Sequence, residues 1–202
     1  MSTNECREFL RKVKNADQDI RSMAVSDLLS HLNTLTTSLS KDDGKEYTDA
    51  LIELLLDAQS YVQNLATECL GLIFKLIDTN TTLATVTNIC TRIGQRGITD
   101  SASALSVALR VMVSRVAESM EDKSFVTKMA HPIVTALSKS KEQPADVNID
   151  LFAALSEVVE NAGSLLAAEG GPADAVEALL LDYSTHSNPN LVRRAFAVLG
   201  KF

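Results

Sequence analysis

The side chains most often used for catalysis are scattered along this chain of 202 residues. None of its three histidines, His31, His131 and His186, has a cysteine, serine or carboxylate at the spacing of a nucleophile or a metal site. The glycines near 94–97 and 170–171 lack the pattern of a phosphate-binding loop. The sequence therefore predicts no catalytic residue, no cofactor and no bound metal, and it disfavours an enzyme.

The three cysteines, Cys6, Cys69 and Cys90, are odd in number and widely separated. Each lies among apolar residues at helical spacing, whereas a disulfide framework or a zinc cluster needs paired or closer cysteines. We therefore expect buried free thiols in a reducing compartment.

Acidic side chains offer another kind of chemistry, electrostatic recognition. Residues 142–192 hold nine acidic residues and neither lysine nor arginine, while the net charge of the whole chain is −7. Four of the nine, Asp146, Asp150, Glu157 and Glu160, would fall within about 80° of one another on a helix. We call these four residues the acidic stripe. It is either a solvated helix face or a surface that attracts a basic partner.

A helix that buries one side is predicted where apolar residues follow the spacing i, i+3, i+4, i+7, i+8 and i+11. The residues with this spacing are Val62, Leu65, Ala66, Cys69, Leu70 and Ile73. Similar patterns recur about 42 to 44 residues apart, a period within the roughly 40 to 47 residues of HEAT and armadillo repeats. These copies begin near Ile20, Ala104, Val147 and Leu191.

The predicted fold is therefore all-α, an α-solenoid of about five HEAT-type helix pairs. We expect one array over residues 1–202, with repeats near 1–40, 41–80, 81–121, 122–165 and 166–202. The composition agrees, since 4% aromatic residues, no tryptophan and 46% hydrophobic residues suit helices that pack closely over small side chains.

Cap and turn residues predict the helix ends in the first two repeats. The second helix of repeat one restarts at Asp17 or Asp19 and runs to about Ser38. Residues 40–44 and 79–82 are rich in cap-forming and turn-forming side chains, and we expect both segments to be turns.

Two prolines predict helix starts in repeat four. Pro132 indicates a kink or a late helix start near His131, because proline removes a backbone donor. Pro144 suits the first turn of the second helix. Residues 161–163, Asn-Ala-Gly, are a candidate helix stop.

Asp19, Arg21, Gln63 and Asn64 are further candidates for partner contact from the second-helix face. The structural alternative is that Asp19 caps a helix, while Arg21 and Gln63 bridge adjacent repeats through side-chain hydrogen bonds.

The apolar pattern continues to the last residue through Ala195, Phe196, Leu199 and Phe202. The outer face of a solenoid needs a polar terminal repeat to stay soluble. Either the chain is a fragment of a longer array, or another chain or segment stacks on these four residues.

Charge and hydropathy exclude several partner classes. A net charge of −7 disfavours nucleic-acid binding, which depends on clustered lysine and arginine. Residues 1–13 lack the uninterrupted apolar core of a secretory signal. The apolar run 51–56 is much shorter than the roughly 20 residues needed to span a membrane. We expect a soluble protein of the cytoplasm and nucleus.

Three segments also resemble a known family. Residues 17–24, residues 62–71 and, more weakly, residues 188–200 are similar to the start of the cullin-associated, neddylation-dissociated proteins, also called TIP-type HEAT proteins. The resemblance covers nearly the whole chain in register and is strongest through about residue 77.

The resemblance implies a long HEAT array that wraps a cullin lacking its ubiquitin-like modification. The N-terminal arm would embrace the C-terminal domain of the cullin and its RING-box subunit, and the other arm would block the adaptor site. Such proteins act as exchange factors for the substrate receptors of cullin-RING ubiquitin ligases. This chain would be the N-terminal arm, with the remaining HEAT repeats in a longer chain or in a second one.

The alternative is a generic helical-repeat scaffold or nuclear transport adaptor with another protein partner. Co-purification with a cullin, sensitive to neddylation of that cullin, would favour the first hypothesis. Dependence on a transport GTPase would favour the second.

Overall fold

The computed structural model describes residues 3–95, 99–141, 143–168 and 171–201. All of the secondary structure in these ranges is helical. The predicted fold class, an all-α helical-repeat fold of the solenoid type, is therefore confirmed. The contacts divide the chain into two compact units, Met1–Thr85 and Val86–Phe202.

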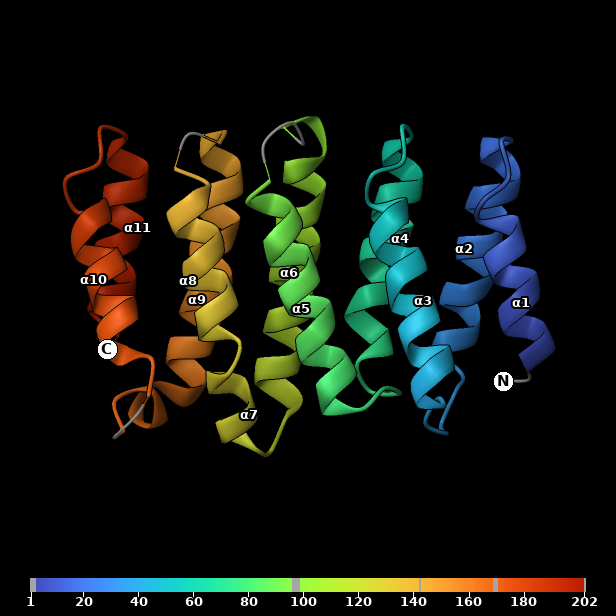
Figure 1. Ribbon diagram of the computed structural model, residues 1–202, viewed down its shortest axis with the longest axis horizontal. Helices are drawn as coiled ribbons and strands as arrows, with labels where there is room; N and C mark the ends of the chain where they lie inside the picture. Colours follow the sequence, from blue (N-terminus) through green and yellow to red (C-terminus); the bar gives the residue numbers. More distant parts are fainter. Residues whose placement is uncertain (1–2, 96–98, 142, 169–170, 202) are drawn as a thin grey trace. The chain divides into compact units, whose positions relative to one another are not determined.

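The first unit contains two helix pairs. Helix α1 packs against α2, α3 packs against α4, and the pairs stack through α1 with α3 and α2 with α4 (Figure 1). The four helices are α1 (Thr3–Lys12), α2 (Gln18–Leu32), α3 (Lys41–Leu54) and α4 (Ser60–Ile73). Helix α5 (Thr79–Ile93) begins in this unit and ends in the second.

The second unit stacks its helices in the same manner. Helix α6 packs against α9, α9 against α11, and α8 against α10 (Figure 1). The bounds are α6 (Thr99–Ser119), α7 (Lys123–Thr127), α8 (Ala130–Lys139), α9 (Ala145–Leu166), α10 (Ala173–Tyr183) and α11 (Pro189–Leu199). Each predicted repeat thus contains two helices, except the fourth, which contains three.

The core follows the apolar spacing of the sequence. All six residues of the predicted buried face of α4 are inside the first unit. On α9, Leu151, Leu155, Val158 and Val159 are buried, as expected for residues opposite the acidic stripe. Burial of these one-sided faces against neighbouring helices is the main stabilising term.

Helix α2 ends at Leu32, so the predicted end near Ser38 is wrong. The side-chain amide of Asn33 donates to the Leu29 carbonyl, and the hydroxyl of Thr34 donates to the His31 carbonyl, each at 2.9 Å. These bonds satisfy carbonyls that the last turn of a helix leaves free. Short polar side chains therefore stop the helix before the apolar pattern fades.

The segment 40–44, predicted to be a turn, is the start of α3. The Ser40 hydroxyl oxygen accepts from the Asp43 N–H at 3.1 Å and its O–H donates to the Asp43 carboxylate at 2.7 Å. Gly44 lies within this helix, and the close approach of Ile77 explains the glycine, because a Cβ there would come 2.8 Å from the Ile77 Cγ2. The same residue types cap helices and form turns, and here the cap is formed.

The segment 79–82, also predicted to be a turn, is the first turn of α5. The Asp78 carboxylate accepts from the N–H groups of Asn80 and Thr81 at 2.9 and 3.1 Å. The Thr81 hydroxyl donates to it as well, and this bond lowers the pKa of Asp78 most. Asp78 is thus a helix cap.

The proline predictions in repeat four are confirmed. A short helix, α7, ends before α8 begins at Ala130, and Pro132 lies in the first turn of α8. Pro144 is the N-cap of α9.

The predicted stop at 161–163 is only a kink. Ala162 has φ −145° and ψ 17°, and the helix then continues to Leu166. The Asn161 side chain donates to the Glu157 carbonyl at 2.9 Å, so it satisfies a backbone acceptor close to the kink.

A buried polar cluster joins α8, α9 and α10. Asn148 accepts from the Ser140 hydroxyl at 2.7 Å and donates to the Ser140 carbonyl at 2.9 Å. The Tyr183 hydroxyl donates to the Leu137 carbonyl at 2.8 Å and lies 3.3 Å from the Asn148 side-chain oxygen. Burial raises the pKa of Tyr183 to about 12. The cluster fixes the α8–α9 turn against the next repeat.

Replacement of Asn148 by alanine should lower the free energy of unfolding by about 2 kcal/mol, because it leaves buried groups of Ser140 and Tyr183 without a partner. Urea unfolding followed by circular dichroism measures this change. The exposed Asn64 is the matched control, and Asn64→Ala should change stability by less than about 0.5 kcal/mol. Equal effects of the two changes would show that the cluster does not hold the second unit together.

Candidate functional site

Arg21 connects the first two repeats. Its guanidinium donates to the Asp57 carboxylate through Nε at 2.6 Å and Nη2 at 3.0 Å, and through Nη1 to the carbonyls of Asn15 and Ala16. Both charged side chains are largely buried. The bridge between repeats that the structural alternative proposed for Arg21 is therefore present.

Gln63 contributes to the same cluster from its own repeat. Its side-chain amide donates to the backbone carbonyl of Asp57 at 2.6 Å. Arg21 and Gln63 thus meet at Asp57, a residue that the sequence analysis did not single out. Asp57 lies in the turn between α3 and α4, where several residue types are acceptable. The sequence alone therefore does not mark it as a partner of Arg21 and Gln63.

Asp19 does not cap α2, so this part of the structural alternative is wrong. The cap is Asp17, whose carboxylate accepts from the Asp19 N–H at 2.9 Å. Asp19 is exposed in the first turn of α2, where its negative charge interacts favourably with the positive end of the helix dipole. Asn64 is also exposed. A partner contact by either residue stays a prediction.

The acidic stripe is largely occupied by contacts within the second unit. Asp146 accepts from the Ser103 hydroxyl, and Asp150 pairs with Arg110 at 2.8 Å, both across the interface between α6 and α9. Glu160 pairs with Lys201, which follows α11.

Glu157, the remaining member of the stripe, is half-buried. No ion pair joins it to another described residue. A partner-binding role for the stripe stays a prediction, and Glu157 is its most available member. Of the nine acidic residues, Glu142 and Glu169 lie outside the described residues.

The predicted stacking residues near the chain end differ in exposure. Ala195 is buried, Leu199 is half-buried and Phe196 is 55% exposed. Phe202 lies outside the described residues. Leu181 on α10 is also 55% exposed, so an apolar side chain is open on each of the last two helices. Stacking of a further element on these residues stays a prediction.

Cys6, Cys69 and Cys90 are all free and buried, which confirms that part of the cysteine prediction, while the reducing compartment stays a prediction. Burial raises the pKa of the Cys69 thiol to about 12 and also raises that of Cys90. Both thiols are therefore protonated at neutral pH and poor nucleophiles.

The described ranges contain neither a cluster of metal ligands nor a membrane-spanning helix. No group of three or more histidine, cysteine or acidic side chains is arranged there to hold a metal ion. None of the helices in the described part of the chain is both long enough and apolar enough to cross a bilayer.

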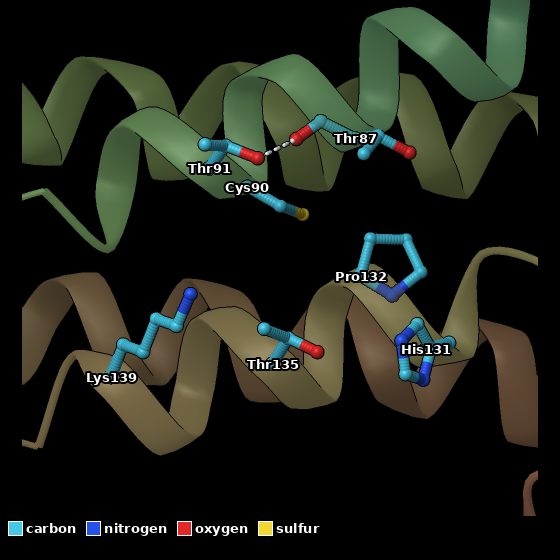
Figure 2. Close-up of a pocket in the computed structure, with 7 residues that line it drawn as sticks. All are labelled: Thr87, Cys90, Thr91, His131, Pro132, Thr135 and Lys139. Atoms are coloured by element: carbon cyan, nitrogen blue, oxygen red, sulfur yellow. Dashed lines mark hydrogen bonds between the residues drawn. The ribbon is translucent and has the colours of Figure 1, made fainter.

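A groove of about 170 Å³ opens between α5 and α8, within the second unit (Figure 2). Its lining residues are Thr87, Cys90, Thr91, His131, Pro132, Thr135 and Lys139. No local sequence pattern predicts this groove, because its walls come from helices about 40 residues apart and each lining residue fits the pattern of its own helix.

The Arg21–Asp57 pair should make the first unit sensitive to acid. The hydrogen bond from Arg21 is the largest cause that lowers the pKa of Asp57. Its contribution to stability is therefore full above about pH 4, the pKa of an unfolded aspartate, and is lost as the pH falls through the lower folded value. Asp57→Asn should reduce stability at pH 7 by about 1 kcal/mol and flatten the pH dependence in the acid range.

Urea midpoints measured from neutral pH down to about pH 3 test this expectation. Asp49→Asn is the matched control, because Asp49 pairs with Lys45 on the exposed surface of α3 in the same unit. A difference between the two variants that does not shrink with falling pH would contradict the assigned role of Asp57.

Three curated proteins similar to this chain are cullin-associated NEDD8-dissociated proteins. Cullin-associated NEDD8-dissociated protein 2 of Mus musculus is 26% identical over 175 residues, which cover 86% of this chain and 14% of that protein. Cullin-associated NEDD8-dissociated protein 1 of Drosophila melanogaster is 23% identical over 164 residues, covering 81% and 13%. The protein 1 of Schizosaccharomyces pombe is 32% identical over 99 residues, covering 48% and 8%.

The other comparisons add little. No family model matches the chain. Two engineered proteins of known structure align over 98% and 100% of it, at 15% and 14% identity, with TM-scores of only 0.36 and 0.37. The chain spans 8% to 14% of the length of the three curated relatives described. Over such a segment, its resemblance to the cullin-associated NEDD8-dissociated proteins is confirmed.

Proposed function

We propose that this chain is a non-catalytic regulator of cullin-RING ubiquitin ligase assembly. It binds the C-terminal domain of an unneddylated cullin together with its RING-box subunit, and it contributes to substrate-receptor exchange. The observation that carries the proposal is the similarity to cullin-associated NEDD8-dissociated protein 2 over 86% of the chain. The helical-repeat fold supports it, because stacked helix pairs present extended surfaces to large partners.

The chain acts as the N-terminal arm of a longer HEAT array or together with a second chain that carries the remaining repeats. Its partners are proteins of the cytoplasm and nucleus, and neither nucleic acid nor a membrane is among them. It works by shape and charge rather than by turnover, and it needs no cofactor. Displacement of an adaptor belongs to repeats outside these 202 residues.

The contacts are best sought among polar residues that the fold does not use. Asp19 and Asn64 are exposed in the first unit. In the second unit, the half-buried Glu157 is the member of the acidic stripe without an ion pair to another described residue. Arg21, Gln63 and Asp150 are poorer candidates, because each is engaged in a contact that holds helices together. Removing such a residue would weaken the fold as well as any partner contact.

Calorimetric titration of the purified chain with an unmodified cullin C-terminal domain and its RING-box subunit tests the proposal. We expect binding that weakens with rising salt, because charged surfaces contribute to the association. We expect it to be lost when the cullin carries NEDD8. No binding, even with a companion chain that supplies further HEAT repeats, would overturn the cullin assignment and favour the scaffold or transport adaptor.

Charge reversal at Asp19 should raise the dissociation constant for the cullin complex by about three- to tenfold, as expected for an exposed charge at an interface. Asp27→Lys is the matched control, since Asp27 is exposed on the same helix and its replacement changes the net charge equally. Glu157→Lys applies the same test to the acidic stripe. If Asp27→Lys weakens binding as much as the other two, overall charge acts and none of these residues is a contact.

A further inference from the structure

We propose that the groove between α5 and α8 binds an acidic peptide segment of a partner protein, with an apolar side chain seated between two carboxylates. The proposal rests on the shape of the groove and on the side chains of Lys139, Thr135 and Thr91 in its lining. It goes beyond the proposed function, and it does not depend on the partner being a cullin.

The groove has an apolar floor and polar ends. Figure 2 shows the Cys90 thiol pointing toward α8 and the Pro132 ring pointing toward α5. Both residues are buried. A cavity of about 150 Å³ can hold a benzene ring, so a groove of this size accepts one branched or aromatic side chain. Lys139 and His131 lie toward opposite ends of the α8 wall (Figure 2).

The lining of the groove includes Lys139 and no aspartate or glutamate, although the net charge of the chain is −7. Residues 79–95 and 123–141, which include the whole of α5, α7 and α8, contain no aspartate or glutamate. The same segments hold Arg92, Lys123, Lys128, Lys139 and Lys141, together with His131. An acidic ligand therefore meets no carboxylate from the helices that line the groove.

Several of these cations already have partners elsewhere. Lys123 donates to the Ala117 carbonyl at 2.7 Å, and Lys141 pairs with Asp182. Lys139 is exposed, and no described acidic residue forms an ion pair with it. Its stem passes Gly94 so closely that a Cβ on Gly94 would lie 3.2 Å from the Lys139 Cδ. Lys139 lines the groove and is thus available to bind an acidic group there.

Two threonine hydroxyl groups in the groove can form hydrogen bonds to a ligand whose carboxylate is held by Lys139. The Thr91 hydroxyl donates to the Thr87 carbonyl at 2.8 Å, as the dashed line in Figure 2 shows, so its oxygen is left to accept from a peptide N–H. Thr135 is half-buried, and no described group hydrogen-bonds to its side chain. Its hydroxyl can donate to a carboxylate next to Lys139.

The spacing of the polar groups sets the spacing of the ligand. His131 and Lys139 are eight residues apart on one helix, which places them about 12 Å apart along its axis. An extended peptide advances about 3.3 Å per residue, so residues i and i+4 span about 13 Å. A peptide segment with two acidic residues four positions apart can therefore place one carboxylate near His131 and the other near Lys139. An apolar residue midway between them then lies over the floor formed by Cys90 and Pro132.

A fluorescent peptide with the core Glu-Ala-Leu-Ala-Glu is the probe, and fluorescence anisotropy with the full chain gives its dissociation constant. Lys139→Glu should raise that constant at least about tenfold, because a charged hydrogen bond is replaced by repulsion. Thr135→Val, which keeps the shape and removes the hydroxyl, should raise it about threefold. Methyl NMR signals of Thr87, Thr91 and Thr135 should shift on addition of the peptide.

Lys14→Glu is the matched control. Lys14 is exposed in the first unit, and its replacement changes the net charge by the same amount. It should leave peptide binding unchanged within about twofold. Equal weakening by Lys14→Glu and Lys139→Glu would overturn the proposal, because only overall charge would then matter.

Two further outcomes would also overturn the proposal. Equally tight binding of a Gln-Ala-Leu-Ala-Gln peptide would show that carboxylates are not recognised. Tighter binding of a five-nucleotide oligothymidine would assign the groove to nucleic acid. The assay contains no cullin, so a negative result leaves the proposed function standing, and absence of cullin binding leaves this proposal standing.

Discussion

The fold depends on one constraint: a helix pair with a single apolar face must bury that face against its neighbours. Polar bonds fix the register of the neighbours within each unit, and they join residues about one repeat apart. The side chain of Arg21 hydrogen-bonds to Asp57, which is 36 residues away in sequence. The corresponding separations are 40 residues for Arg110 and Asp150 and 45 residues for Lys201 and Ser156. The thiol of Cys69 likewise donates to the carbonyl of Val25, which is 44 residues away in sequence. The apolar face supplies the burial, and the polar bonds select one register.

This constraint changes the meaning of charged residues on the second helices. A carboxylate on α9 can face solvent in a helical projection and still lie within reach of a basic side chain from the repeat before or after it. Asp150 and Glu160 are examples, since Arg110 on α6 and Lys201 after α11 meet them. The groove residues Lys139 and Thr135 lie on a first helix and hold no such ion pair among the described residues. Lys139 is therefore a charged group on a first helix that the stacking of repeats leaves available, whereas Asp182 on the first helix α10 pairs with Lys141 of the preceding repeat.

The sequence predicted what depends on spacing and missed what depends on neighbours. The buried face of α4 and the helix start beside Pro132 follow from local order, and the structure contains both. Residues 40–44 and 79–82 were assigned to turns because the same side chains form turns and cap helices, and only the backbone conformation distinguishes the two. The partners of the acidic stripe and the groove walls lie about 40 residues away in sequence, where no local pattern connects them.

Charge acts on two length scales in this chain, and the groove depends on the shorter one. The net charge of −7 repels an acidic segment at long range, but salt at physiological strength screens that field beyond about 8 Å. Contacts within the groove are shorter than this distance and are screened less. An acidic partner is therefore not attracted by the molecule as a whole, and it is held only where Lys139 and the threonine hydroxyls match its carboxylates. Recognition of this kind favours specificity over speed, since steering by the overall field is absent.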